Sequence, residues 1–316
     1  MEPAQPVAET KTPAGPQAAL LLMVAIWAVN FSVAKRVLDT VSPLAFNALR
    51  FPLAAVVVWA ALRWRGRLPL PARADLLRIA ALGVLGNIVY QQLFIFGLAN
   101  TRAGTASVLL AGTPIVTALL SASQRHERVT TSMWIGVLAT MSGIILVVMG
   151  SGQTPGGTET LFGDLLMLGA TVAWAAYTVG SRNLVQRYGS VAMTAWTLWI
   201  GAIGILLLGI PDLLEMDLRA LSAATWSSIV YAGALSIGVA YLLWYHGVRQ
   251  LGSTRTAVYG NLVPAVALGV AWVWLGERPG ALQFAGAAVI LAGVTLAQRK
   301  GARQGLPATG GRALPP

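Results

Sequence analysis

The chain carries polar and aromatic side chains at helical spacing inside segments that are otherwise apolar. Asn87, Tyr90 and Gln91 fall at positions i, i+3 and i+4, so in an α-helix they share one face. Amide and phenol groups on such a face donate and accept hydrogen bonds, and the ring adds a flat apolar surface. This combination favours an amphipathic cavity that binds a small zwitterion or a flat organic solute.

Four other apolar segments supply the remaining residues that we predict to bind a substrate: Trp27, Asn30, Trp174, Tyr177, Tyr241, Tyr245, Tyr259 and Asn261. A different role stays open for the amides, because Asn and Gln in a membrane span also bridge neighbouring helices. Tryptophans near the ends of spans are typical of interfacial belts. We interpret the following residues as such anchors: Trp59, Trp64, Trp134, Trp226 and Trp272.

Arg50 is the deepest ionisable residue of the apolar segments. A guanidinium at that depth is costly unless it is paired, faces water or reaches back to the interface. Two interpretations follow. Arg50 has a structural role at the outer end of its span, or it contacts the carboxylate of a substrate.

Composition argues against catalysis. The chain has no cysteine, which excludes disulfides, thiolate metal sites and a cysteine nucleophile. The apolar segments contain no paired aspartates and no histidine cluster, and the acidic residue nearest to one, Asp164, lies close to its end. We therefore predict no catalytic residue, no metal and no cofactor, which disfavours an intramembrane enzyme. The lack of an embedded carboxylate also disfavours an antiporter of cationic drugs.

The overall composition places the chain in a lipid bilayer. Apolar residues make up 56% of the sequence, charged residues only 10%, and the mean hydropathy is +0.68, well outside the range of soluble domains. About 20 apolar residues cross the hydrocarbon layer. On this basis we predict ten transmembrane helices near 17–36, 43–62, 76–98, 105–123, 132–150, 162–183, 191–209, 225–247, 255–275 and 282–298.

The second half of the chain repeats the first. At one offset of 150 residues the sequence matches Gly97 with Gly247, Pro114 with Pro264, Glu127-Arg128 with Glu277-Arg278, Gly136 with Gly286, and Gly143 with Gly293, while Trp27 matches Trp174 at 147. Repeats of this kind are typical of secondary transporters. Five helices in each repeat force the two halves into opposite orientations, so we expect inverted repeats around a central cavity.

The repeats set the expected domain boundaries. We predict a disordered tail over 1–16, a first five-helix repeat over 17–150, a second over 151–298, and a flexible basic tail over 299–316. We also predict that the acidic residues near Pro211 lie in an outside loop, because proline ends helices.

Basic residues give the orientation. Sixteen of the 22 Lys and Arg residues fall on one predicted side and five on the other, namely Lys35, Arg36, Arg102, Arg219 and Arg278. Positive charge marks the cytoplasmic side. We therefore predict an integral protein of a bacterial inner membrane with both termini in the cytoplasm. The charge of +11 is spread over short loops instead of one stripe, which argues against nucleic acid as a partner.

Pro114 and Pro264 lie near the middle of their spans, where a proline removes a backbone hydrogen bond and bends the helix. As repeat equivalents they predict two matched hinges, one for each gate. Static kinks that only shape the cavity are the alternative.

Each half carries the pattern Gly-x16-Pro-x12-Glu-Arg, from Gly97 to Arg128 and from Gly247 to Arg278. In this pattern the chain resembles the EamA-type drug/metabolite transporter superfamily. Residues 174–178, Trp-Ala-Ala-Tyr-Thr, resemble the sixth helix of its YddG-like amino-acid exporters. The resemblance implies a ten-helix basket in which the fifth and tenth helices are peripheral and Trp174 lines the cavity. The residues before Pro114 lack the aromatic side chain of that branch, which argues against large aromatic substrates.

The resulting prediction is an exporter of amino acids or similar small metabolites that works by alternating access. A carrier of nucleotide-sugars, vitamins or cationic drugs is the alternative within transport, and a passive channel is the alternative outside it. The partners we predict are a small-molecule substrate and the lipid bilayer, and the sequence leaves the oligomeric state open.

Overall fold

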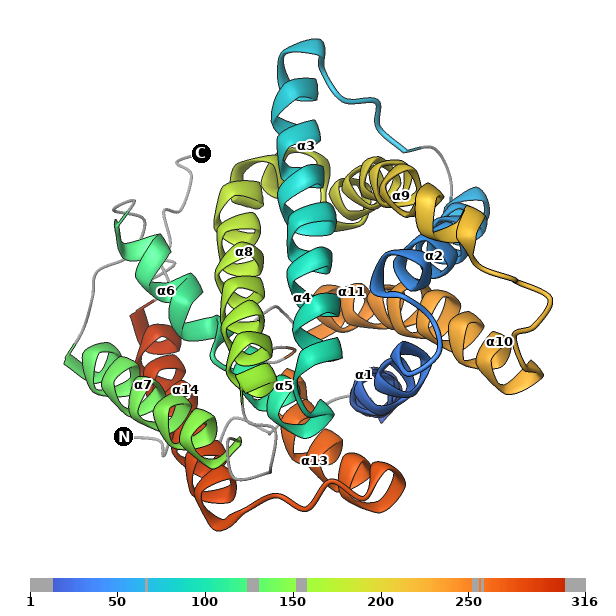
Figure 1. Cartoon of the computed structure of the whole chain (residues 1–316). Helices are drawn as coiled ribbons and strands as arrows, with labels where there is room; N and C mark the ends of the chain where they lie inside the picture. The colour runs from blue at the N-terminus through green and yellow to red at the C-terminus, as the bar shows by residue number, and fades with distance from the viewer. Residues whose placement is uncertain are drawn as a thin grey trace, which may run out of the picture.

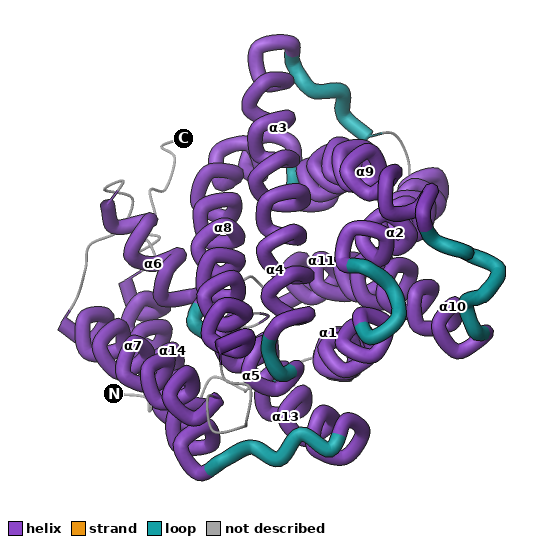
Figure 2. Tube along the Cα trace, viewed as in Figure 1, coloured by secondary structure: helices purple, strands orange, loops and turns teal. Residues whose placement is uncertain are grey.

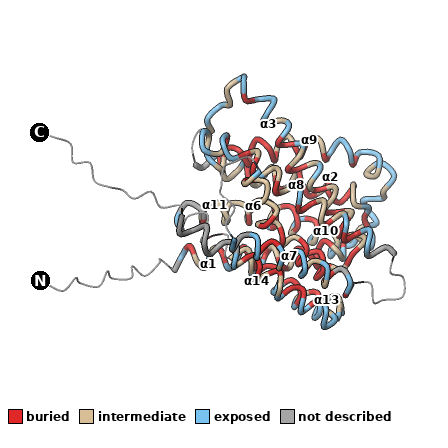
Figure 3. The backbone as a smooth tube through the Cα atoms, turned by 90° about the vertical axis from the view of Figure 1, so that its left-hand side faces the viewer, coloured by how far each residue is buried: buried red, intermediate tan, exposed pale blue. Residues whose placement is uncertain are grey.

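The computed structural model describes residues 14–65, 68–123, 131–151, 158–251, 256 and 259–304. Every regular element in these residues is a helix, and they contain no strand (Figure 2). Buried residues run through the interior, and exposed ones are concentrated toward the outside of the bundle (Figure 3). Many exposed residues are large and apolar, among them Leu77, Leu207 and Val273 at 82%, 61% and 87% exposure. Such a surface fits lipid as its surroundings.

The helices follow one another along the chain as drawn in Figure 1. They are α1 (Ala14–Leu38), α2 (Pro43–Arg65), η1 (Arg73–Asp75), α3 (Leu76–Gly83), η2 (Val84–Val89), α4 (Tyr90–Asn100), α5 (Ala103–Leu110), α6 (Thr113–Ser123), α7 (Thr131–Ser151), α8 (Thr158–Tyr188), α9 (Ser190–Glu215), α10 (Ala223–Val230), η3 (Tyr231–Val239), α11 (Ala240–Leu251), α13 (Val263–Leu275) and α14 (Ala281–Gln304).

Seven helical segments of the described chain are long and apolar enough to cross a membrane: Gly15–Leu38, Pro43–Arg63, Arg73–Asn100, Ala103–Ser123, Leu161–Tyr188, Ser190–Glu215 and Ala223–Gly247. Three shorter apolar helices follow the same pattern, at Trp134–Val147, Val263–Leu275 and Ala281–Leu296. Each of the ten predicted spans overlaps one of these segments. The prediction of an all-helical membrane protein is therefore confirmed.

The helix boundaries repeat between the halves, with one change of offset. Pro43 of α2 and Ser190 of α9 begin their helices 147 residues apart, whereas Tyr90 of α4 and Ala240 of α11 do so 150 residues apart. The change falls within η2 and η3, two π-helical segments of 6 and 9 residues. A π-helix absorbs inserted residues without breaking the helix around it. The three extra residues of the second half are accommodated there.

Helices α7 and α14 pack so closely that glycine is required on both. A Cβ at Gly143 would lie 2.7 Å from the carbonyl oxygen of Gly286, and one at Gly286 would lie 2.6 Å from that of Gly143. Further along, a Cβ at Gly293 would lie 2.7 Å from the carbonyl oxygen of Gly136. Small residues allow such backbone approach in membranes. The pairing of 143 with 286 and of 136 with 293 makes the two helices antiparallel.

The two repeat-related prolines begin helices, which differs from the predicted bend in one continuous helix. Helix α5 ends at Leu110 and α6 begins at Thr113, so Pro114 is the second residue of a new helix. Pro264 likewise occupies the first turn of α13. Proline is tolerated there because the first N–H groups of a helix have no partner within it. The result at both sites is a break between two helical pieces.

Pro211 does not end a helix, and this prediction was wrong. Helix α9 continues through Pro211 to Glu215, so Asp212 and Glu215 are helical, while Asp217 follows in the loop. The hydroxyl of Ser42 donates a hydrogen bond to the Asp212 carboxylate.

The predicted tails lie largely outside the described residues. Helix α1 begins at Ala14, and α14 continues to Gln304, six residues beyond the predicted end of the last span. The Glu127-Arg128 pair and residues 152–157 also lie outside the described part of the chain.

Glu277, the repeat equivalent of Glu127, lies within the described residues and caps a helix. One carboxylate oxygen of Glu277 accepts a hydrogen bond of 2.8 Å from the backbone N–H of Ala103, and the other accepts one of 3.0 Å from that of Gly104. A negative charge stabilises the N-terminus of a helix, here that of α5. The second half of the chain thus holds an element of the first half in place.

Candidate functional site

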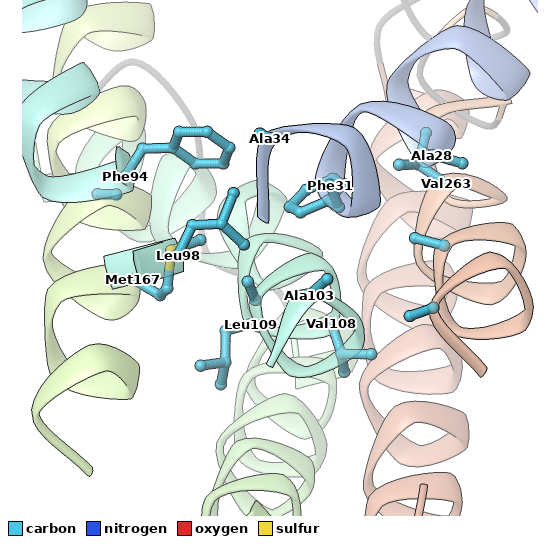
Figure 4. Packing of buried hydrophobic residues seen from close by; sticks show 14 of the residues in the cluster. Ala28, Phe31, Ala34, Phe94, Leu98, Ala103, Val108, Leu109, Met167 and Val263 are labelled. Atoms are coloured by element: carbon cyan, nitrogen blue, oxygen red, sulfur yellow. The ribbon is translucent and has the colours of Figure 1, made fainter. Parts of the chain in front are cut away.

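Aromatic rings from three helices form a continuous row inside the bundle. Phe31 of α1 meets Phe94 of α4 with ring centroids 5.8 Å apart, as Figure 4 shows from close by. Phe94 continues to Tyr90 at 6.0 Å, Tyr90 to Trp174 at 4.9 Å, and Trp174 to Tyr177 at 5.3 Å. Tilted and edge-on contacts of this kind stabilise ring clusters beyond simple burial. The row links the first half of the chain to α8 in the second half.

A second ring group includes Trp27, which lies one helical turn before Phe31 on α1. Trp27 contacts Tyr241 edge-on at 6.2 Å and Trp244 at 5.7 Å, both from α11. The indole N–H of Trp27 donates to the backbone oxygen of Ser236 in η3 over 2.9 Å, which fixes the ring. A Cβ at Gly260 would lie 3.8 Å from the Trp244 ring. The turn that carries Tyr259 and Asn261 therefore adjoins this group.

Four predicted tyrosines connect the two ring groups. Tyr241 lies near Tyr90, Tyr177 and Tyr245. Two of the hydroxyls are held by threonines of α9. Tyr177 lies 3.1 Å from the hydroxyl of Thr197, and Tyr245 hydrogen-bonds to Thr194. We call the eight rings of both groups the ring cluster: Trp27, Phe31, Tyr90, Phe94, Trp174, Tyr177, Tyr241 and Trp244.

Arg50 lies in the wall of the ring cluster and is almost fully buried, at 1% exposure. Its Nε donates to the Asn47 side-chain oxygen over 2.9 Å, and its Nη2 donates to the Gln91 side-chain oxygen over 2.7 Å. Asn47 in turn donates to the backbone oxygen of Gln91 over 3.3 Å. Two neutral amides therefore fix the position of the guanidinium between α2 and α4.

Rings surround the same guanidinium. Its central carbon lies 4.8 Å from the centroid of Phe46 and 5.8 Å from those of Phe51 and Phe94. Tyr90 and Tyr241 are also close enough to interact with the charge. Arg187 forms an ion pair with Asp75 at 2.7 Å. Arg50 thus has cation–π and amide contacts but no carboxylate partner among the described residues.

For two predicted residues, Asn87 and Asn30, the described contacts differ from those of the rings and Arg50. Asn87 lies in η2 and faces α9, because a Cβ at Gly201 would lie 2.2 Å from the Asn87 Cβ. The i+3 and i+4 spacing assumes an α-helix, and the π-helical turn between Asn87 and Tyr90 changes the angle between them. Asn30 is buried at 7% exposure, and its side-chain oxygen has no hydrogen-bond partner in the described part of the chain.

The predicted anchor tryptophans point outward. Trp59, Trp134, Trp226 and Trp272 are 53%, 53%, 36% and 54% exposed. The side chain of Trp64 lies outside the described residues. Exposure of these rings on an apolar surface agrees with an interfacial position.

Sequence reasoning missed the polar partners that organise the site, notably Asn47, Thr194 and Thr197. A signal for the first was present, because Asn47 and Arg50 stand three residues apart within one span. The threonines carried no such signal, because threonine is common in helices and often bonds only to its own backbone. Thr194 and Thr197 stand 147 residues after Asn47 and Arg50.

A helical membrane protein in which rings, amides and a fixed charge from both halves converge has the form of a solute transporter. The comparison with protein families establishes this class: the model of the EamA-like transporter family matches residues 17–149 and again residues 161–298. The chain belongs to this family of membrane transporters. The two matches correspond closely to the two halves found in the sequence.

Curated relatives match along nearly the whole chain. A protein of Streptantibioticus cattleyicolor named "Probable terminal-alkyne amino-acid exporter" is 32% identical over 282 residues, which cover 89% of this chain and 93% of that protein. A Salmonella typhimurium protein named "Probable amino-acid metabolite efflux pump" is 28% identical over 282 residues, covering 87% and 91%. A crystal structure with 19% identity covers 93% of this chain and all of its own, with a TM-score of 0.65, and supports the fold alone.

Proposed function

We propose that this transporter exports amino acids or similar small metabolites by alternating access, with the ring cluster and Arg50 as its substrate site. The observation that carries the proposal is the convergence of rings, phenol groups and a buried guanidinium from both halves of the chain. Rings suit an apolar side chain or an ammonium group, and the guanidinium suits a carboxylate. The two relatives named for amino-acid export point to the same class of solute.

We further infer that all ten apolar segments cross the membrane as two inverted five-helix repeats. The antiparallel pairing of α7 with α14 supports this. A two-fold axis in the membrane plane makes repeat-equivalent helices run in opposite directions. Helices α2 and α9, also equivalents, pack antiparallel too. The Trp199 indole donates to the backbone oxygen of Ala55 over 3.4 Å, and Gly209 packs against Ala48.

Contacts between the ends of helices support the proposed arrangement of the spans, because they join ends that we predict on the same side of the membrane. Lys35 donates to the backbone oxygens of Leu98 and Ala99 over 2.9 and 2.8 Å, which joins two ends predicted outside. Arg187 pairs with Asp75 at two ends predicted inside. A reporter fused after Pro316 should be active only in the cytoplasm. A C-terminus on the outer side would contradict the inverted arrangement.

The breaks at Pro114 and Pro264 are the proposed hinges. In each case two helical pieces meet at a pair of residues outside regular helix, at 111–112 and 261–262. A break leaves fewer backbone hydrogen bonds to disrupt when the halves rock. The equivalent positions of the two breaks suit one hinge for each gate.

Counterflow in proteoliposomes tests the proposed function. Vesicles loaded with each of the twenty amino acids would be diluted into labelled solute of the same kind, with protein-free vesicles as the control. A carrier for amino acids shows labelled uptake that unlabelled internal solute accelerates. A channel shows equilibration without acceleration. Acceleration only by nucleotide-sugars, vitamins or organic cations would reassign the substrate class.

A further inference from the structure

We propose that Arg50 binds the carboxylate of the transported solute and is the specificity-determining charge of the site. This inference rests on the proposed function, because it assigns one group of the substrate to one residue of the ring cluster. It excludes the purely structural role for Arg50 that the sequence leaves open. Four observations support it: the missing charge compensation among the described residues, the unused hydrogen-bond donors, the neighbouring rings, and the residue at the equivalent place in the other half.

Among the described residues, no anion compensates the charge of Arg50. The side chain is 1% exposed and forms no ion pair with a carboxylate of the described residues. Removing a guanidinium from water costs several kcal/mol even after local relaxation, and neutral amides recover only part of that. Arginine keeps its proton under any physiological condition, so the charge persists. An anionic group that enters the site restores the balance.

The guanidinium also keeps donors for a ligand. It carries five N–H bonds in a planar fork, and the structure assigns one hydrogen bond to Nε and one to Nη2. Both acceptors are fixed, since Asn47 and Gln91 are buried at 0% and 6% exposure and bond to each other. A held guanidinium with unused donors is preorganised for a carboxylate, which accepts two parallel hydrogen bonds.

Arg50 shares its surroundings with the rings of the site. Phe94 contacts the guanidinium at 5.8 Å and the Tyr90 ring at 6.0 Å, so the charge and the ring row are neighbours. Tyr241 lies near Arg50 and contacts Trp27 edge-on. A carboxylate on Arg50 therefore places the remainder of a small solute among rings. That arrangement suits an α-ammonium group or an apolar side chain.

The other half of the chain shows that the fold does not need this charge. Thr197 stands 147 residues after Arg50, in helix α9, which begins 147 residues after α2. Thr197 is buried at 1% exposure and bonds to Tyr177 and to its own helix. A hydroxyl thus fills the place that the guanidinium fills in α2. The positive charge is an addition to one half, as expected for a group that selects the solute.

The test compares each acid with its own amide. For every solute that the wild-type protein transports, competition by the acid is measured against competition by the carboxamide of equal shape. Wild type should prefer the acid by roughly tenfold or more, the value of one charge-assisted contact. Arg50→Gln should reduce this preference to about unity, and Arg50→Lys should retain part of it. Arg63→Gln is the matched control, because Arg63 lies on the same helix but is exposed and stacks on Trp59.

A second variant covers the case in which Arg50→Gln does not fold. Gln91→Glu keeps the shape of the side chain that touches Arg50 and supplies a carboxylate from within. It should lower competition by acids roughly tenfold while competition by amides changes little, because the internal carboxylate occupies the guanidinium. An unchanged acid preference in Gln91→Glu, or a preserved preference in a folded Arg50→Gln protein, overturns the proposal.

Failure of the proposed function gives a different result. If no amino acid is transported but another carboxylic acid is, the same acid and amide comparison applies to that solute and still tests Arg50. If the transported solutes carry no carboxylate, the inference about Arg50 fails together with the amino-acid assignment. If amino acids and their amides compete equally in wild type, the export function stands and the role of Arg50 falls.

Discussion

At the contact between α7 and α14, residues related by the 150-residue repeat are identical, whereas in the site they differ. Gly136 matches Gly286 and Gly143 matches Gly293 in the repeat. Gly143 packs against Gly286 and Gly136 packs against Gly293, so each of these contacts consists of the repeat equivalents of the other. A two-fold axis between like surfaces produces this reciprocity. Geometry alone determines the residues, because any side chain would collide with backbone.

The site breaks the same symmetry. At an offset of 147 residues the residue types differ between the halves: Arg50 corresponds to Thr197, Asn47 to Thr194, and Asn30 to Tyr177. Trp27 and Trp174 are an identical pair at this offset. The first half supplies a charge and amides, and the second supplies hydroxyls. The backbone frame is shared between the halves, while the side chains in the centre are specialised. A solute with two unlike ends is what such a site can orient.

The largest expected effect comes from the glycine contact and is one of stability. Gly143→Ala puts a Cβ 2.7 Å from a backbone oxygen and from Ile290, so the helices must separate. We expect the free energy of unfolding to fall by about 3 kcal/mol, the upper part of the range for overpacking. The temperature at which half of the detergent-solubilised protein loses its monodisperse elution peak measures this.

Gly269→Ala is the control for that variant. Nothing lies within 4 Å of a Cβ built at Gly269, in the interior of α13. Alanine should stabilise this helix by up to about 1 kcal/mol, because it loses less conformational freedom than glycine on folding. If both alanine variants lose their elution peak at the same temperature, the close helix contact does not explain why residue 143 is glycine.

The next effect separates the two kinds of tryptophan and is one of transport. Trp174→Ala removes a ring that contacts both Tyr90 and Tyr177, so the site loses its central surface. We expect counterflow to fall roughly tenfold or more, as for a buried aromatic anchor of about 2 kcal/mol. Trp226→Ala, at a 36% exposed position, should change counterflow little at matched expression. An equal loss of counterflow in the two variants would contradict the assignment of Trp174 to the substrate site and of Trp226 to the membrane interface.

A smaller effect probes the hydroxyl side of the site. Thr197→Val and Tyr177→Phe each remove one partner of a 3.1 Å hydrogen bond. Each change should weaken apparent affinity about fivefold, in line with roughly 1 kcal/mol for one hydrogen bond. The double variant should lose little more than either single one, since the same bond is already gone. Thr295→Val, whose hydroxyl bonds only to the carbonyl of Leu291 in its own helix, is the control. Full additivity would show that the two groups act separately.

The smallest expected effect is none at all. Arg50 does not titrate at physiological pH, because arginine stays protonated. Its equivalent in the second half, Thr197, is neutral. A pH difference imposed across proteoliposomes without a solute gradient, at clamped membrane potential, should therefore not drive accumulation. Sustained uphill uptake that a protonophore abolishes would contradict this. Asp164, which is buried and accepts a 2.6 Å hydrogen bond from Thr101, would then be the first candidate for the proton site, followed by His246.

Much of the architecture follows from local features of the sequence. Hydropathy and segment length predict where helices form, because a helix in lipid satisfies its own backbone hydrogen bonds wherever about 20 apolar residues follow one another. The repeat offsets indicate which helices are equivalent. The spacing of Tyr90 and Gln91 predicts a shared face. Local rules failed where context overrides them: Pro211 lies within α9, and the π-helical turn redirects Asn87 toward α9.

The sequence by itself determined that this is a duplicated helical membrane protein, and it singled out most of the aromatic residues that the structure brings together in the ring cluster. Only the tertiary structure decided which groups meet. Glu277 caps a helix 173 residues earlier in the chain, and Gln91 holds Arg50 across 41 residues. Such contacts depend on the rotation and depth of each helix relative to its neighbours. Those quantities are set by the packing of whole helix surfaces, which short-range spacing along the chain does not encode.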